Sequence, residues 1–126
     1  MAAPENFPRE SRLLRPAEFA RVYAVRRSVA RGPLVLYAAA RSEPGGRPRL
    51  GLSVSRRIGN AVRRNRWKRR LREAFRHVQG KLDPHCDYII VVRSGKPHAG
   101  SDHERQTERM IIELAVRVAN GGGPPR

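Results

Sequence analysis

Ten arginine and lysine side chains gather between residues 56 and 76, and only one acid, Glu73, lies among them. Charges this dense repel one another, because almost no acids are available for pairs three or four positions apart on a helix. A planar guanidinium can pair with a phosphate through two parallel hydrogen bonds, so arginine is well suited to nucleic acids. We therefore interpret this stretch as a nucleic-acid contact and not as an ordinary solvated surface.

One long helix is expected to position these charges. Gly59 and Asn60 form a break followed by a good N-cap, and nothing interrupts a helix from there to Gln79. At about 100° per residue, the apolar positions fall on a single stripe that should pack against a core. These positions are Trp67, Leu71, Ala74, Phe75 and Val78. The basic residues then occupy both flanks of this stripe.

The overall composition favours the same kind of partner. A length of 126 residues fits one domain, and the net charge of +16 favours a nucleic acid strongly and an anionic membrane only weakly. No apolar run approaches the roughly 20 residues that span a bilayer, and no signal-peptide core is present at the N-terminus. Cys86 is the only cysteine, which excludes an intramolecular disulfide and a cysteine zinc cluster. We expect a cytoplasmic protein without a membrane partner.

The first half of the chain predicts one helix and two strands. Pro16 suits the first turn of a helix, and apolar residues at helical spacing extend it over residues 16–27. Residues 34–41 and 49–55 are typical of strands, and the second alternates apolar and small residues. A strong turn signal at residues 43–46 lies between them. We predict that these two strands pair as an antiparallel hairpin.

The second half predicts a strand and a helix after the basic helix. Residues 87–93 are apolar on both faces, which favours an interior strand. Ser101 and Glu104 have the spacing of a capping box, from which a helix should run to Ala119. Its buried face should carry Thr107, Ile111, Leu114, Ala115 and Val118. The predicted order is αββαβα, and the basic helix could connect its two flanking strands as a crossover in one sheet.

The sequence around the basic helix resembles the protein subunit of bacterial ribonuclease P. The matching residues of the family's signature helix are Gly59-Asn60-Ala61-Val62, Arg64-Asn65-Arg66, Lys68-Arg69 and Arg72. Further similarity lies at Arg12-Leu13-Leu14, at residues 16–23 and 34–37, and at residues 87–90. Trp67 departs from the aliphatic residue that the family often has there, although an aromatic ring can still fill the stripe. The resemblance covers residues 12–119, whereas composition alone predicts a flexible arm at residues 1–11 and a disordered tail at residues 120–126.

The resemblance also implies the fold class and the function. The fold would be α/β (α+β), with a mixed sheet packed with helices and a left-handed βαβ crossover, ribosomal protein S5 domain 2-like. The function would be that of the RNA-binding subunit of ribonuclease P, which removes the 5′ leader from precursor tRNA. The protein would be a monomer, one per catalytic RNA, and would bind that RNA and the single-stranded leader. It would supply no catalytic group and hold no cofactor, since magnesium acts through the RNA.

Two sets of site residues carry over from the resemblance. The RNA-binding set is Arg56, Arg57, Asn60, Arg64, Asn65, Arg66, Lys68, Arg69 and Arg72. The leader-binding cleft would comprise Phe19, Tyr23, Tyr37, Ser53 and Ser55. Taken alone, Phe19 and Tyr23 would be interpreted as core residues and the two serines as ordinary outward strand residues. The resemblance favours a partly exposed aromatic surface, on which unpaired bases stack without strong sequence preference.

Two other functional classes remain as alternatives. A nuclease with its own active site would need a metal or acid–base cluster, but the four histidines are scattered and Asp83 and Asp87 flank a structural turn. The histidines are His77, His85, His98 and His103. A non-catalytic RNA-binding module would share the composition and charge but not the ordered motif at residues 64–66. A DNA-binding role ranks lower, because nothing resembles a helix-turn-helix unit.

Overall fold

The computed structural model describes residues 12–41, 46–93 and 103–119. The described elements are α1 (Pro16–Val25), β1 (Ser28–Arg31), β2 (Leu34–Ala40), β3 (Arg49–Val54), a short 3-10 helix (Arg56–Ile58), α2 (Ala61–Val78), a second 3-10 helix (Gln79–Lys81), β4 (Cys86–Val92) and α3 (His103–Ala119). This order confirms the predicted αββαβα arrangement, with the short strand β1 as an addition. Residues 43–45 of the predicted turn, Ser101 of the predicted capping box, the arm and the tail lie outside the described residues.

The four strands form one mixed sheet in the order β1-β2-β4-β3. β2 pairs with β4 in antiparallel fashion, and β3 pairs with β4 in parallel. The predicted hairpin between β2 and β3 is therefore wrong, because β4 lies between them. The actual hairpin joins β1 to β2 through Gly32 and Pro33, with Ser28 opposite Tyr37. The predicted crossover is confirmed, since α2 connects the parallel neighbours β3 and β4; its left-handed sense stays a prediction.

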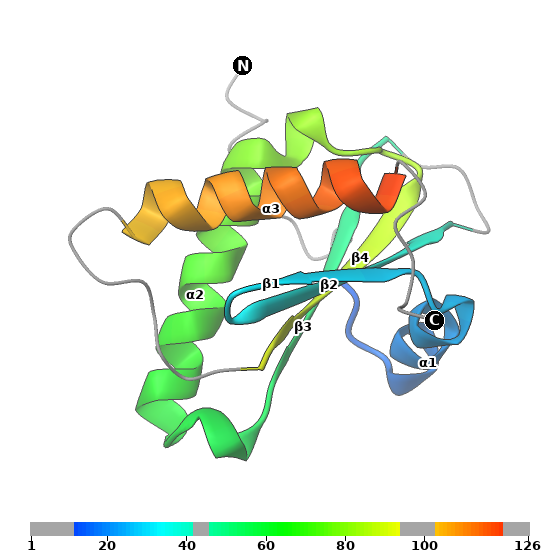
Figure 1. Cartoon of the computed structure of the whole chain (residues 1–126). Helices are drawn as coiled ribbons and strands as arrows, with labels where there is room; N and C mark the ends of the chain where they lie inside the picture. Colours follow the sequence, from blue (N-terminus) through cyan, green and yellow to red (C-terminus); the bar gives the residue numbers. More distant parts are fainter. Residues whose placement is uncertain (1–11, 42–45, 94–102, 120–126) are drawn as a thin grey trace.

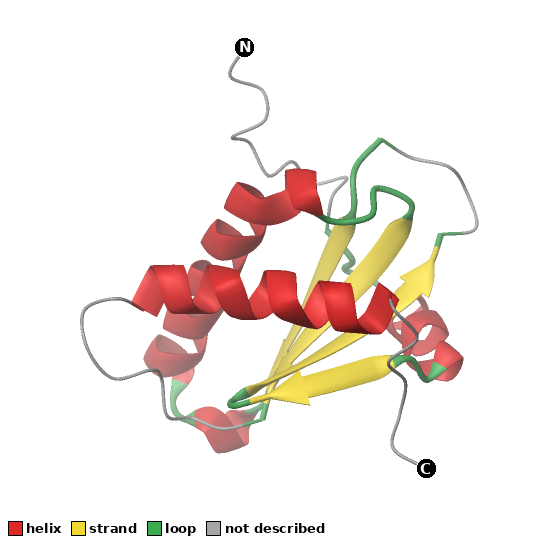
Figure 2. Ribbon diagram, turned by 45° about the horizontal axis from the view of Figure 1, so that its top comes forward, coloured by secondary structure: helices red, strands yellow, loops and turns green. Residues whose placement is uncertain are grey.

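Helices cover both faces of the sheet. Helices α2 and α3 pack on one face, and α1 lies on the other, as Figures 1 and 2 show. The strand alternation matches this arrangement: Leu34, Leu36 and Ala38 of β2 belong to the core beneath α2 and α3, while Ala39 belongs to the core beneath α1. Helices cover both faces of β4, which explains its nearly continuous apolar sequence. The prediction that this segment is an interior strand is therefore confirmed.

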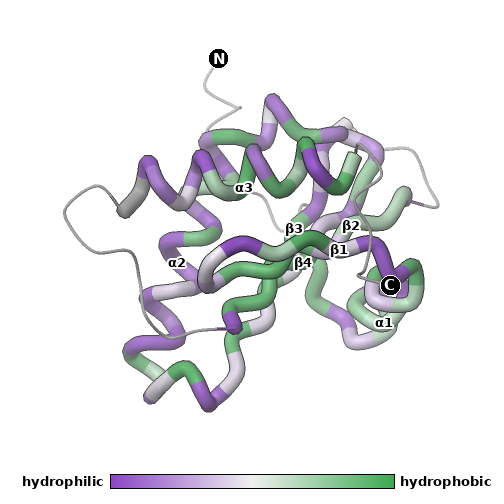
Figure 3. The backbone as a smooth tube through the Cα atoms, viewed as in Figure 1, coloured by the Kyte–Doolittle hydropathy of each residue, from purple (hydrophilic) through white to green (hydrophobic). Residues whose placement is uncertain are grey.

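Helix α2 begins and packs as its sequence predicts. Asn60 is the N-cap, and its side-chain oxygen accepts a hydrogen bond from the backbone N–H of Arg63 at 2.9 Å. The five predicted stripe residues are the buried residues of this helix, and Trp67 fills its place at 3 % exposure. The predicted face of α3 is buried as well, from Thr107 to Val118. Figure 3 shows the contrast between the largely hydrophobic strands and the long hydrophilic stretches of α2.

A smaller core holds α1 and the segment before it against the sheet. Its buried residues are Leu13, Val22, Ala39 and Ile89. The backbone N–H of Leu13 donates to the carbonyl of Leu50 at 2.9 Å, so this segment extends the sheet beyond the edge of β3. Gly51 of β3 is buried on this face, because Leu13 and Phe19 cover it.

A buried carboxylate ties α1 to the sheet. Asp87 of β4 is fully buried, and both of its oxygens accept hydrogen bonds at 2.8 Å from Arg49 of β3. Arg21 of α1 also donates to Asp87, and the guanidinium of Arg41 lies 3.8 Å away. Glu18 of α1 forms a further ion pair with Arg49. We call this group, made of Glu18, Arg21, Arg41, Arg49 and Asp87, the Asp87 cluster.

Candidate nucleic-acid interface

The basic surface of α2 lies on both sides of its buried stripe, as predicted. Arg63, Asn65, Arg66 and Arg69 are exposed, and Arg64, Lys68, Arg70 and Arg72 are half-buried. Within the described part of the chain, Lys68, Arg69 and Arg72 have no acidic partner. Burial lowers the pKa of Arg72, and the positive charges of Arg12 and Arg69 lower it further. This surface therefore carries a positive potential that the rest of the described protein does not neutralise.

The acids near α2 are found at its C-terminal end. Glu73 accepts a hydrogen bond from Arg76 at 2.7 Å, and the ring of His77 lies 2.8 Å from Glu108 of α3. The hydrogen bond from Arg76 is the main cause that lowers the pKa of Glu73. The unpaired charges are thus concentrated in the first two-thirds of the helix. We define the basic surface as Arg63, Arg64, Arg66, Lys68, Arg69 and Arg72.

The connection from β3 to α2 adds cations next to this surface. Arg56 and Arg57 are exposed on the 3-10 helix, which is anchored by the buried side chain of Ile58. Gly59 follows at a φ of 152°, and a Cβ atom there would lie 2.6 Å from the Arg63 side chain. The Nε of Arg64 donates to the Gly59 carbonyl at 3.2 Å, which holds its guanidinium beside the helix start. The sharp entry to α2 therefore places these arginines close together.

Three aromatic residues lie on the opposite face of the sheet, beside α1. The rings of Tyr23 and Tyr37 meet edge to face at 4.8 Å, and those of Phe19 and Tyr23 are 6.3 Å apart. Tyr23 also forms a side-chain hydrogen bond with Ser53 of β3. Burial raises the pKa of Tyr23 above its ordinary value. The structure thus brings together four of the five residues predicted for the leader-binding cleft.

Phe19, Tyr23, Tyr37 and Ser53 are half-buried. Their exposure is intermediate between that of core residues and that of an open binding surface, the two interpretations made from the sequence. The three aromatic residues pack against the smaller core but keep part of their surface accessible. We call Phe19, Tyr23, Tyr37 and Ser53 the aromatic face. The half-buried Val91, which the sequence analysis did not select, packs in the same cluster. The strand period of two could have identified Val91, because it lies between Ile90 and Val92, which belong to the main core on the other face.

The position of Phe19 depends on a glycine in the strand beneath it. A Cβ atom at Gly51 would lie 2.7 Å from the ring of Phe19, closer than real side chains approach. Any other residue at this position would force the Phe19 ring to shift. The Asp87 cluster acts on the same helix, because Arg21 and Glu18 bond to residues of the sheet. The sequence analysis missed this cluster, since its members are far apart along the chain.

The aromatic face and the basic surface are not one continuous site. They lie on opposite faces of the sheet, and β3 with its following segment connects them (Figure 1). Ser53 belongs to the aromatic face, whereas Ser55 is exposed beyond the end of β3. Ser55 therefore lies at the junction and not within the aromatic cluster.

Known proteins are similar to this chain in sequence and in architecture. A family model of ribonuclease P matches residues 7–115. The chain belongs to the ribonuclease P protein family. The ribonuclease P protein component of Shouchella clausii is 45 % identical over 111 residues, covering 88 % of this chain and 90 % of the relative. That of Listeria innocua is 36 % identical over 105 residues, covering 83 % and 86 %.

Solved structures agree with the family assignment. The ribonuclease P protein of Staphylococcus aureus superposes with a TM-score of 0.71 at 30 % identity, covering 90 % of this chain and 98 % of that one. The protein from Thermotoga maritima reaches the same TM-score at 25 % identity, covering 83 % and 96 %. Family membership supports a role in ribonuclease P and in tRNA processing.

Across residues 12–41, 46–93 and 103–119, no three His, Cys, Asp or Glu side chains converge in a way that could hold a metal ion. None of the helices in these same ranges has the length and apolar character needed to cross a bilayer.

Proposed function

We propose that this chain is the RNA-binding subunit of ribonuclease P, which removes the 5′ leader of precursor tRNA by endonucleolytic cleavage. The basic surface of α2 binds the catalytic RNA, and the aromatic face binds the single-stranded leader. The observation that carries the proposal is the basic surface itself, whose cations lack acidic partners among the described residues although acids are paired elsewhere on the fold.

Electrostatics supports the first contact. Each phosphate that a lysine or arginine neutralises releases condensed counterions, which supplies much of the affinity for RNA at moderate salt. The repulsion between Arg12, Arg69 and Arg72 would fall when a phosphate lies among them. Arg56, Arg57 and Asn60 extend this contact toward β3, with Asn65 on the same helix.

The chemistry of the aromatic face supports the second contact. Leader sequences vary, so a site that binds them must tolerate any base. Aromatic rings meet this need because each base has a stacking face, with about 1–3 kcal/mol gained per base. The hydroxyl groups of Tyr23 and Ser53 offer polar contacts beside these rings.

Cleavage and magnesium binding are assigned to the RNA partner. The carboxylates of Glu18, Glu73, Asp87 and Glu108 are engaged by arginine or histidine side chains. An acid held in this way is a poor metal ligand or general base, because its charge already stabilises a partner. The protein therefore contributes binding and positioning, and one copy per catalytic RNA is expected, in the cytoplasm.

A cleavage assay on precursor tRNA at low magnesium tests the proposal. The catalytic RNA would be assayed alone and with the protein added, and we expect clear stimulation by the protein. Cleavage by the protein without RNA would instead favour a nuclease with its own active site. Binding to RNA without stimulation would favour a non-catalytic RNA-binding module, and either result would contradict the proposal.

The leader contact is tested separately with Tyr37→Ala in the assembled enzyme. We expect a loss of about 1–3 kcal/mol in affinity for precursor tRNA, and a smaller loss for mature tRNA, which has no leader. Circular dichroism of the variant establishes that it is folded. An equal loss for both substrates would show that Tyr37 acts only as a packing residue.

A further inference from the structure

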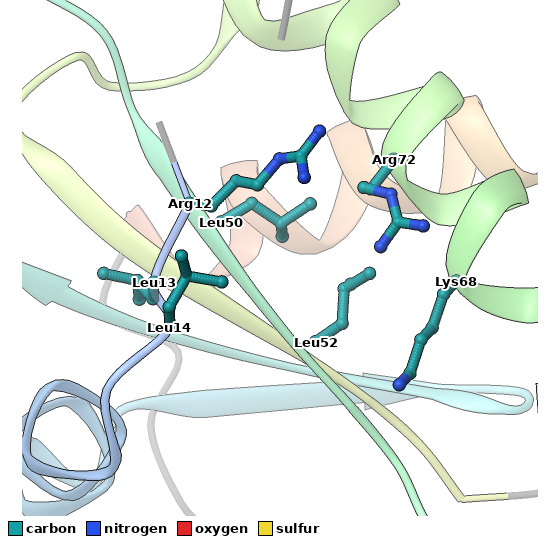
Figure 4. Close-up of a pocket in the computed structure, with 7 residues that line it drawn as sticks. All are labelled: Arg12, Leu13, Leu14, Leu50, Leu52, Lys68 and Arg72. Carbon is teal, nitrogen blue, oxygen red and sulfur yellow. The ribbon is translucent and has the colours of Figure 1, made fainter. Parts of the chain in front are cut away.

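A half-open hollow lies between helix α2 and the outer edge of β3. Its volume is about 150 Å³, and it is separate from the aromatic face, which lies on the other side of the sheet. Figure 4 shows Leu50 and Leu52 of β3 on one side and Lys68 and Arg72 of α2 on the other. Arg12 and Leu14 line it from the segment that precedes α1.

The lining combines an apolar floor with a cationic rim. Leucine side chains come from β3 and from the segment before α1, while three cations surround them, and none of the described lining residues is acidic. Leu14 is 54 % exposed, although large apolar side chains in this fold are mostly buried. In Figure 4 the guanidinium groups of Arg12 and Arg72 extend toward the same space. Their mutual repulsion is one cause of the lowered pKa of Arg72.

The size of the hollow limits what can occupy it. Pockets for drug-sized ligands usually measure about 300–1,000 Å³, so this one is too small for such a molecule. An apolar cavity of about 150 Å³ does accept a single aromatic ring, such as benzene. A flat ring with an attached anion would match both the floor and the rim. An unpaired nucleotide has this form, since its base is a flat ring system and its phosphate carries the negative charge.

We propose that this hollow binds one unpaired nucleotide of the RNA that lies along α2. The base lies against Leu14, Leu50 and Leu52, and its phosphate pairs with Lys68 and Arg72. Protein sites for unstacked bases commonly use apolar or aromatic side chains around the ring and cations around the backbone. The inference rests on the proposed function in one respect, because RNA along α2 supplies the nucleotide.

Methyl NMR spectroscopy of the full chain, with labelled leucines, tests this site directly. The protein is titrated at low ionic strength with a trinucleotide of adenosines, and separately with an abasic trinucleotide that has the same phosphates. We expect the trinucleotide to shift the methyl signals of Leu14 and Leu52, with about tenfold tighter binding than the abasic ligand. Leu14→Ser should remove most of this difference, whereas Leu14→Met should retain it.

Two control variants separate this site from the rest of the protein. Val116→Ser makes a similar change on α3, where Val116 is 51 % exposed, and should leave both affinities unchanged. Tyr37→Ala weakens the aromatic face and should leave the Leu14 and Leu52 shifts in place. Equal binding of the two ligands would show a site for phosphate alone, and unshifted leucine signals would show no site; either result overturns the inference. Neither result depends on the cleavage assay, so the two proposals can fail independently.

Discussion

Two groups of arginines in this protein have opposite environments. In the Asp87 cluster, Arg21, Arg41 and Arg49 surround one fully buried carboxylate. On the basic surface of α2, Lys68, Arg69 and Arg72 lie together with no acidic partner among the described residues. The first group is paired with acids inside the fold, whereas the second is available to an anion from outside.

The comparison shows that the number of arginines does not indicate their purpose, whereas the position of the nearest acid does. A buried acid gives an arginine a structural contact, since removing either partner leaves an uncompensated charge. An arginine without an acidic partner raises the self-repulsion of the free protein. The two groups should therefore respond differently to mutation, to RNA and to salt.

The largest effect is expected for Asp87→Asn. Its neutral amide cannot offset three guanidinium groups, so the free energy of unfolding should fall by about 3 kcal/mol. The value lies at the low end for buried pairs, because the arginines retain some access to water. Urea unfolding measures the change. Asp83→Asn is the matched control, since Asp83 is exposed and an asparagine can still accept the hydrogen bond from His85.

The second prediction concerns Arg69→Ala on the basic surface. Loss of a charge-assisted contact with phosphate should weaken binding to the catalytic RNA by about 1.5–3 kcal/mol. The free energy of unfolding should not decrease, because Arg69 has no partner within the described fold. Arg117→Ala on α3 controls for net charge. A loss of stability as large as that of Asp87→Asn would remove the distinction between the two groups.

The third prediction concerns anions and the free protein. An anion that binds the folded basic surface stabilises it by mass action, by about 1.4 kcal/mol at ten times its Kd. For a chain of this length the melting temperature should rise by roughly 5 °C with sulfate at low ionic strength. Thermal unfolding followed by circular dichroism measures this rise.

A neutral excluded osmolyte is the necessary control, because sulfate also favours burial in any protein. The osmolyte is used at a concentration that matches the effect of sulfate on an ordinary protein. Asp87→Asn should keep the response to sulfate, whereas Arg69→Ala should reduce it. Equal responses to sulfate and osmolyte would mean that the basic surface does not bind anions.

The smallest effect is expected for Arg76→Ala. Arg76 belongs to the same helix and is half-buried, but it is already paired with Glu73, whose side chain is exposed. RNA affinity should change by less than about 0.5 kcal/mol, and stability by a similar amount, because a pair with an exposed partner contributes little. Titration of the catalytic RNA with this variant and with Arg69→Ala compares the two positions directly. A loss equal to that of Arg69→Ala would extend the basic surface to the end of α2.

The sequence predicted the elements whose signals are local. The stripe of α2, the Asn60 cap and the buried face of α3 follow from helical periodicity, which depends on neighbouring residues only. The pairing of strands was not predictable in this way. A turn signal between β2 and β3 suggested a hairpin, but β4 pairs with both through contacts far apart in sequence.

The same limit applies to the candidate site. The basic residues of α2 were identified because they are consecutive and lack acids. Strand β1 was missed, because Ser28–Arg31 has only four residues and a weak pattern. The Asp87 cluster joins residues between positions 18 and 87, and its geometry appears only once the strand order is known. Sequence therefore predicts individual helices better than contacts between distant elements.

The position of β4 has a consequence for how the protein is made. Both neighbours of β4 precede it in the chain, yet it lies between them in the sheet. Leu36 of β2 and Leu52 of β3 therefore lack the partner that they share until Ile90 has been synthesised. During synthesis from the N-terminus, β2 and β3 stay without their common partner until that residue has left the ribosome. Their unpaired edges could meanwhile join other chains. The sheet is thus completed only after most of the chain has been translated, and a chain that ends before Cys86 lacks the strand that joins β2 to β3.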